Sequence, residues 1–277
     1  MTLRRMTLDD LEMVLDWAAE EGWNPGREDA AAFLASDPEG FFLAERDGRP
    51  TAAISVVNHD DRHAFLGLYI CRPEFRRQGI GFALWSEALR HAGGRSIGLE
   101  GVPAQQANYA RSGFVATGST LRMEGLLPAG LPSATGLRAW QPRDAIAVAA
   151  LDLAATGHGR GRFLEAWTGE SQARRTVVAE GPDGIAGFAT ARLCRSGGKI
   201  GPVIAPDCAT ALALIAGAAE ALGLERIAID VPQGNTPLLA ALMAAGFAET
   251  FRTARMIRGT PPAGSASLQA VATLELG

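Results

Sequence analysis

The sequence has 277 residues, of which 47% are hydrophobic and 20% charged, so it can bury a full core and exceeds one average domain. Its net charge of −4, with Lys199 as the only lysine, argues against nucleic acid as the main partner, and its three cysteines argue against a disulfide framework or a zinc site. Charged residues stand where a signal peptide needs an apolar stretch, and no uncharged run reaches the roughly 18 residues of a membrane span, so we expect a cytoplasmic protein with no membrane partner.

In chain order, hydrophobic periodicity and turn signals predict an α/β pattern for residues 1–125. A strand at 3–6 is followed by an amphipathic helix from Asp9, its expected cap, to Glu21, and by a second helix at 27–36. Strands at 41–46 and 50–57 are joined by an Asp-Gly turn, and a long strand follows at 63–71. A helix at 79–91, a strand at 96–102, a helix at 103–112 and two closing strands at 113–118 and 120–125 complete this half.

Residues 126–136 lose this periodicity and gather Pro, Gly and Ser, which indicates a linker. From 137 to 277 the same order of elements returns in weaker form. Both halves end alike: a strand gives Val-Pro, a helix gives Gly-Phe, and a final strand gives Arg-Met. We interpret the chain as a tandem duplication of one α/β domain, with the two copies at 1–125 and 137–277.

The stretch Arg76-Arg77-Gln78-Gly79-Ile80-Gly81 lies between a strand and a helix. Free N–H groups and the positive dipole end of a helix can hold a phosphate or pyrophosphate, and glycines let a ligand approach the backbone. The arginines would add charge-assisted hydrogen bonds, although an ordinary strand-to-helix turn can carry the same residues. A Walker loop is excluded because the one lysine precedes Ile200, and a dinucleotide fingerprint is excluded because position 84 is Leu.

Four motifs in the right order make the sequence resemble the GCN5-related N-acetyltransferases (GNAT). They are "EGWNPG", "DPEGFF", "YICRPEFRRQGIGFALW" and "GLEGVPAQQANY", and a Tyr109-x-x-x-Gly113-Phe114 pattern follows a further strand and helix. Together they are similar to a bacterial tandem subfamily whose second domain is a degenerate acetyltransferase fold. The resemblance implies an α/β protein of two GNAT-like domains, each a mixed, mostly antiparallel twisted sheet flanked by helices.

The resemblance also implies that acetyl-CoA is the co-substrate and lies in a splayed gap between the strands at 63–71 and 96–102. Its pyrophosphate would rest on backbone N–H groups from Arg77 to Gly81, and its thioester carbonyl on the backbone of Ile70 and Cys71. No metal is expected. The residues expected to bind the cofactor are Ile70, Cys71, Arg76, Arg77, Gln78, Gly79, Ile80, Gly81 and Asn108.

Tyr109 matches the family's tyrosine acid, whose phenol can protonate the departing thiolate. The alternative for Tyr109 is an aromatic core residue at a helix end. A protonated acceptor amine must also lose a proton, and Glu100 is the first candidate for the base, although a strand carboxylate in a salt bridge explains it equally well. Weaker candidates for the base are Asp60, Asp61 and His63.

Trp23 and Asn24 interrupt the first helical pair where this family usually forms the acceptor wall. Tyr69 and Glu100 are expected to complete the acceptor site beside them. A tryptophan packed in a turn is an equally ordinary explanation for Trp23.

Two further motifs are rejected as nucleophiles. Gly94-Arg95-Ser96-Ile97-Gly98 has the spacing of a serine elbow, but the helix precedes it and the strand follows, which is the reverse of what a serine hydrolase needs. Cys71 has no His-Asp arrangement near it in the sequence, so we expect it to line the cofactor slot.

The second half lacks the Arg-x-x-Gly-x-Gly set and has no tyrosine. Asp207 stands with Pro206 where a phosphate would have to bind, and a carboxylate at a helix start repels phosphate. We therefore expect this half to bind no acetyl-CoA and instead to complete the acceptor pocket or bury part of the first domain. Arg160 and Arg162 could reach an acidic group of the substrate or lie on the surface.

The sequence thus predicts an enzyme that transfers an acetyl group from acetyl-CoA to a primary amine of a small acceptor by direct attack. The alternatives are an acyl-CoA-binding sensor or structural module without turnover, and an enzyme that acylates a protein. Retention of Tyr109 favours the enzyme, since a binding module needs no acid beside the sulfur. A homodimer is compatible with the sequence.

Overall fold

The computed structural model describes residues 1–127 and 136–277, so most of the expected linker at 126–136 lies outside the described residues. The strands of the first half are β1 (Thr2–Arg5), β2 (Phe41–Arg46), β3 (Arg49–Asn58), β4 (His63–Cys71), β5 (Ser96–Gly101) and β6 (Val115–Leu126). Its helices are α1 (Leu8–Glu20), α2 (Asp29–Ser36), α3 (Ile80–His91) and α4 (Gln106–Arg111), with 3-10 turns at Pro73–Phe75 and Pro103–Gln105.

The second half repeats this order. Its strands are β7 (Leu137–Ala139), β8 (Arg174–Gly181), β9 (Gly184–Leu193), β10 (Gly198–Ile204), β11 (Arg226–Pro232), β12 (Ala248–Arg258) and the additional β13 (Leu268–Ala270). Its helices are α5 (Ala145–Thr156), α6 (Gly161–Thr168), α7 (Cys208–Ala221) and α8 (Thr236–Ala244), with a 3-10 turn at Pro142–Asp144.

All the described strands join one 13-stranded sheet. Its order is β1-β2-β3-β4-β5-β12-β6-β11-β10-β9-β8-β7, and β13 pairs with β10 outside this order. The pairs β4–β5 and β10–β11 are parallel, and the other described pairs are antiparallel. The sheet is therefore mixed and mostly antiparallel, as the sequence predicted.

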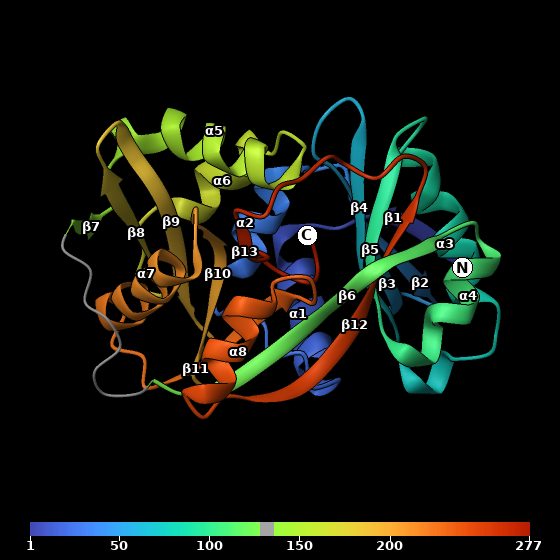
Figure 1. The fold of residues 1–277 in the computed structure, drawn as a ribbon. Coiled ribbons are helices and arrows are strands. Elements are labelled where there is room, and N and C mark those ends of the chain that lie inside the picture. Colours follow the sequence, from blue (N-terminus) through green and yellow to red (C-terminus); the bar gives the residue numbers. More distant parts are fainter. Residues whose placement is uncertain (128–135) are drawn as a thin grey trace.

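The last strand of each repeat is exchanged between the halves. β12 lies beside β5 of the first half, and β6 lies beside β11 of the second half, with β6 and β12 paired to each other in the middle. In Figure 1 these two long strands cross the centre of the molecule. Residues 113–118 and 120–125, expected as two closing strands, instead form the single strand β6 of 12 residues, because this strand pairs with β12 along one edge and with β11 along the other.

Three buried apolar clusters hold the fold together. One lies under α3 beside the first half of the sheet, and a second lies under α7 and α8 beside the second half. The third is shared, because α1 and α2 of the first half and α5 and α6 of the second contribute residues to it. In it α2 packs against α6, with the Phe33 and Trp167 rings stacked 6.0 Å apart. The shared cluster and the exchanged strands make the two repeats one folding unit.

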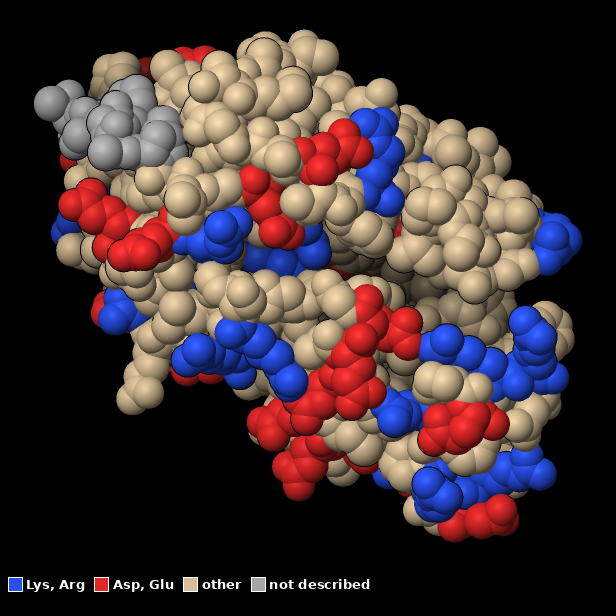
Figure 2. All heavy atoms as spheres, turned by 90° about the horizontal axis from the view of Figure 1, so that it is seen from below, with Lys and Arg blue, Asp and Glu red and all other residues tan. Residues whose placement is uncertain are grey.

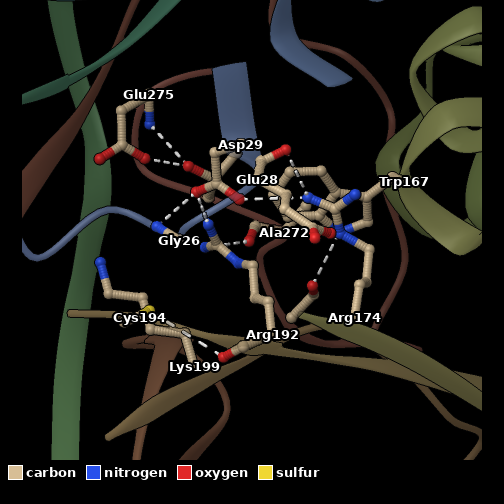
Figure 3. Close-up of polar contacts among 12 residues, drawn as sticks. Gly26, Glu28, Asp29, Trp167, Arg174, Arg192, Cys194, Lys199, Ala272 and Glu275 are labelled. Atoms are coloured by element: carbon tan, nitrogen blue, oxygen red, sulfur yellow. Dashed lines mark hydrogen bonds and ion pairs between the residues drawn. The ribbon is translucent and has the colours of Figure 1, made fainter. Parts of the chain in front are cut away.

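A buried ionic group accompanies the shared cluster (Figure 3). Asp29 at the start of α2 is 1% exposed, pairs with Arg174 and Arg192 of the second half, and accepts a hydrogen bond from the Gly26 N–H (2.8 Å). Both guanidinium groups also lie over the Trp167 ring, 4.6 and 4.5 Å from its centre. Burial of one carboxylate between two cations fixes the orientation of the halves.

The N-cap of α1 differs from the expectation. Thr7, and not Asp9, caps the helix, because the Thr7 hydroxyl accepts from the Asp10 N–H (3.2 Å) while the Asp10 carboxylate accepts from the Thr7 N–H (2.8 Å). None of the helices in the described part of the chain combines the length and apolar character needed to cross a membrane.

Candidate active site

The parallel strands β4 and β5 separate at the point where the sequence placed the cofactor gap. Their register runs from His63 opposite Ser96 to Leu66 opposite Leu99 and ends there, although both strands continue. A bulge follows on β4: its register with β3 shifts between Gly67 and Ile70, and Leu68 takes a positive φ of 47°. Such a conformation is strained for a branched side chain and is found mainly at functional sites.

The start of α3 offers a row of free backbone donors. The first N–H with a backbone acceptor is that of Ala83, which donates to Gly79 (3.1 Å), while the N–H groups of residues 77–82 have no acceptor among the described residues. Arg77 and Gly79 adopt φ values of 63° and 80°, which turn the chain into the helix. A Cβ added at Gly79 would stand in open space. These donors fit a pyrophosphate.

The polar side chains of this stretch are less available than the sequence suggested. Arg76 donates to the Cys71 carbonyl (2.8 Å) and pairs with Glu21 of α1 (2.5 Å), so it ties the end of β4 to α1. Gln78 accepts from Arg46 (2.7 Å) and donates to the Glu74 carbonyl (2.9 Å). The Ile80 side chain is buried in the core under α3, which leaves only its backbone for a ligand.

A cleft and a smaller cavity meet where β4 and β5 part. The cleft has a volume of about 960 Å³ and is lined by Ile70, Cys71, Arg76, Arg77 and Asn108, among others. The cavity, of about 80 Å³, lies between the halves. The two spaces are adjacent, because they share part of their lining: Trp23, Tyr69, Arg122 and Phe251. Figure 2 shows this protein from below, with acidic and basic side chains interspersed and a hollow in the right part of the view.

Tyr109, on α4, lines the cavity and is 7% exposed. Its ring stacks on Trp85 at 5.6 Å, and no described residue forms a hydrogen bond with its hydroxyl. Burial, with a smaller contribution from Tyr69, raises the pKa of Tyr109 to about 12. The phenol therefore keeps its proton at neutral pH and can donate it.

Tyr69 and Trp23 also line the cavity, as expected, but Asn24 does not. The Tyr69 hydroxyl lies over the start of α3, where a Cβ on Gly81 would come within 2.7 Å of it. Asn24, with a φ of 51°, donates to the Ser196 carbonyl (2.8 Å) and accepts from the Ser196 N–H (3.1 Å). Its amide is thus a tie between the halves.

Glu100 lies in the cavity wall with both carboxylate oxygens occupied. Oε1 accepts from Thr120 (2.9 Å) and Arg255 (3.0 Å), and Oε2 accepts from Thr253 (2.6 Å). All three donors are on the exchanged strands β6 and β12, and the Glu100 side chain is only 1% exposed. The salt-bridge interpretation of Glu100 therefore describes its contacts, and three of the four acceptor positions of its carboxylate are filled.

The weaker candidates for a base lie away from the cavity. The Asp60 carboxylate accepts from the backbone of Arg62, His63 and Gly159; burial raises its pKa, but these bonds lower it further, so it stays below its usual value. Asp61 is fully exposed. Among the described residues, no group of three metal-ligating side chains is arranged to hold an ion.

Arg160 differs from what the sequence suggested, whereas Cys71 lies where it was expected. Arg160 is buried and paired with Asp152 (2.8 Å), so it is neither a surface residue nor a wall of the cavity. Cys71 lines the cleft, and burial raises the pKa of its thiol, which favours the unreactive protonated form.

The segment 271–277 is a part of the site that the sequence did not reveal. Leu274 and Glu275 line the cavity, and a Cβ on Gly67 in the β4 bulge would collide with the Glu275 carbonyl. Figure 1 shows residue 277 in the middle of the molecule, between the halves. The apolar run around Glu275 carries no periodicity long enough to reveal this position.

Two family profiles match the chain. The one described as "Acetyltransferase (GNAT) family" matches residues 8–114, and the one described as "Acetyltransferase (GNAT) domain" matches residues 148–269. Over its whole length the chain is 33% identical to a protein named holothin acyltransferase from Pseudoalteromonas sp. (strain SANK 73390), of which it covers 94%. The chain belongs to the GNAT superfamily. It is an acyltransferase of the GNAT type with two GNAT domains in tandem.

Solved GNAT structures share this fold. A putative acetyltransferase from Pyrococcus horikoshii aligns with 100% of this chain and 95% of its own, with a TM-score of 0.83 and 23% identity. A tandem GNAT protein from the clavulanic acid biosynthesis pathway aligns over 95% and 99%, with a TM-score of 0.66 and 18% identity. At these identities the likeness concerns the fold alone, and it agrees with the tandem arrangement.

In the second GNAT domain the equivalent gap is filled by the chain itself. β10 and β11 pair up to Ile200 opposite Ile229 and then part. Beyond that point β13 pairs with β10, and the Val271 N–H donates to the backbone carbonyl of Asp230 on β11 (2.9 Å). The start of α7 is also occupied, because the Asp207 carboxylate accepts from the Thr210 N–H (2.8 Å). Both the gap and the anion site of this domain are thus closed by protein groups.

Proposed function

We propose that this GNAT protein transfers an acetyl group from acetyl-CoA to a primary amine of a small acceptor, with Tyr109 as the general acid. The observation that carries the proposal is the pairing of two features along one cleft. The free N–H groups at the start of α3 can hold the pyrophosphate, and the protonated phenol of Tyr109 lies in the cavity that opens from the same cleft.

The chemistry follows from these groups. The bulge at Leu68 turns the backbone of β4 toward the gap, where N–H groups at Ile70 and Cys71 would polarise the thioester carbonyl. The neutral amine attacks that carbon directly, the C–N bond forms and the C–S bond breaks. Tyr109 gives its proton to the leaving sulfur, and the α3 cradle keeps the cofactor in line.

The walls of the cavity support a small acceptor. Side chains of both halves enclose a space of about 80 Å³, and the second half covers it, which counts against the open groove that a protein acceptor needs. The name of the relative, holothin acyltransferase, supports holothin as a candidate acceptor. Holothin therefore belongs in the first panel of acceptors.

The test is acetyl-CoA turnover across a panel of amines, followed by thiol release and by the mass of the product. Tyr109→Phe should lower kcat by about 10²- to 10⁴-fold, the usual contribution of a general acid, with acetyl-CoA affinity retained. Tyr69→Phe is the matched control, because Tyr69 is the other tyrosine of the chain and its hydroxyl lies over α3; it should lose much less. Tight binding of acetyl-CoA without release by the unmodified protein would favour the sensor instead.

A further inference from the structure

The acceptor cavity contains three charged side chains, and two of them are already neutralised. Glu100 accepts three hydrogen bonds, one of them from Arg255. Arg122 gives Nε and Nη2 to Asp230, both at 2.8 Å, and Nη1 to the Trp23 carbonyl (3.3 Å). Only one acceptor position of Glu100 is left, on Oε2, and Arg122 has no lone pair that could take a proton.

Glu275 is the third charged side chain, and it has a free oxygen. Its Oε2 accepts from the Thr273 hydroxyl, whereas no described residue donates to Oε1. The residue is 5% exposed and lines the cavity, so its carboxylate is sheltered from bulk water. Its backbone lies against Gly67, at the bulge where the thioester carbon is expected.

The segment that carries Glu275 is fixed on both sides. Before it, Arg192 donates to the Ala272 carbonyl (3.1 Å), a contact drawn in Figure 3. After it, His59 donates to the Leu276 carbonyl (2.7 Å), and Arg160 donates to the Gly277 carbonyl. A side chain held in this way is preorganised to receive a proton in one geometry.

We propose that Glu275 of the second half is the base that takes a proton from the acceptor amine in the first half's active site, an inference that rests on the proposed function. The ammonium of the acceptor gives one proton to Oε1, and the neutral amine then attacks the thioester carbon. As the C–N bond forms and the C–S bond breaks, the sulfur takes the Tyr109 proton. The nitrogen sheds its second proton through water in the cleft to the Tyr109 phenolate, and Glu275 releases its own to solvent.

The experiment compares two amines of similar shape, benzylamine and aniline, with acetyl-CoA as donor. Benzylamine is protonated at neutral pH and needs a base, while aniline is neutral and does not. Glu275→Gln should lower kcat/KM for benzylamine by about 10²-fold or more and leave kcat/KM for aniline nearly unchanged. Activity toward aniline also reports that the variant is folded.

Two further variants sharpen the result. Thr273→Val removes the hydroxyl that orients the Glu275 carboxylate. It should lower kcat/KM for benzylamine less than Glu275→Gln does, and it should again spare aniline. Glu100→Gln is the matched control in the same cavity, and any loss there should be equal for the two amines, because Glu100 acts through its structural contacts.

The outcomes separate the two proposals. Equal loss on both amines in Glu275→Gln, or no loss on either, would overturn the role of Glu275 while leaving the acetyltransferase intact. Absence of turnover by the unmodified protein with benzylamine, aniline and holothin alike would instead count against the proposed function.

Discussion

The Arg122–Asp230 pair joins the exchanged strand β6 to β11, and its removal should cost more stability than any exposed ion pair of the protein. The two residues are direct register partners, both side chains are 6% exposed, and two hydrogen bonds of 2.8 Å connect them. Burial alone would raise the pKa of Asp230, but the Arg122 charge and hydrogen bonds lower it below its usual value. Arg122→Met therefore leaves a charged carboxylate buried without its partner.

The expected loss is about 3–5 kcal/mol in the free energy of unfolding, the usual cost of breaking a buried pair from one side. For a chain of this length that loss corresponds to a fall in Tm of roughly 5–9 °C. Urea unfolding and differential scanning calorimetry measure the two quantities. The double variant Arg122→Met with Asp230→Leu should recover most of the loss, because neither member of the pair is then left buried without the other.

Arg252→Met is the control, because it removes an exposed ion pair with the same hydrogen-bond distances. Arg252 and Glu249 on β12 also form two hydrogen bonds of 2.8 Å, but their side chains are 45% and 38% exposed. We expect a much smaller loss there, because solvent screens an exposed ion pair. A loss of the same size in Arg122→Met, or a double variant as unstable as the single one, would refute the argument that burial makes this pair essential.

Three further predictions concern the cradle, the histidines and the bulge. Gly79→Glu should abolish acetyl-CoA binding in calorimetric titration, because it places a carboxylate beside the free N–H groups of α3. It should also lower the Tm modestly, because a side chain at a φ of 80° is strained although it meets no neighbouring atom. Burial lowers the pKa of His158 to about 2 and that of His59 to about 4. The unfolded chain takes up these protons near pH 6.5 and the folded protein does not, so the free energy of unfolding should fall as the pH drops below that value. The fall should reach about 1.4 kcal/mol per pH unit for each histidine until its folded pKa is reached, and urea unfolding at a series of pH values measures it. Gly67→Val should displace the Glu275 backbone and lower kcat, with the acetyl-CoA affinity nearly unchanged; unaltered turnover would mean that the segment does not support catalysis.

Local patterns were enough to predict the parts of the site that lie within one repeat. The strand at 63–71 was predicted to the residue, because an apolar run ends there at Arg-Pro, and the helix after Gly79 begins one residue later than expected. Tyr109 was placed on the short helix before Gly113-Phe114, where the structure has it. These features depend on residues close together in the sequence.

The parts that were missed depend on contacts between the repeats. An alternating strand pattern shows which face of β6 is buried, but not that its neighbours are β11 and β12 rather than β5. The choice for Glu100 between a base and a salt-bridged carboxylate stayed open, because its donors Thr253 and Arg255 arrive from the other half. Asn24 was expected in the acceptor wall, and its hydrogen bonds to Ser196 could not be predicted because the two residues are 172 positions apart.

The duplication also explains why the second half is needed although its own gap is filled. Gly67 in β4 and Gly201 in β10 stand at the same point of the two repeats, where each parallel pair parts. A Cβ at Gly201 would collide with the Val271 carbonyl, and a Cβ at Gly67 would collide with the Glu275 carbonyl, so one segment runs past both positions. Its first residues fill the gap of the second repeat, and its next residues wall the cavity of the first. The loss of a cofactor gap in one repeat and the completion of the acceptor cavity in the other are therefore two effects of the same segment.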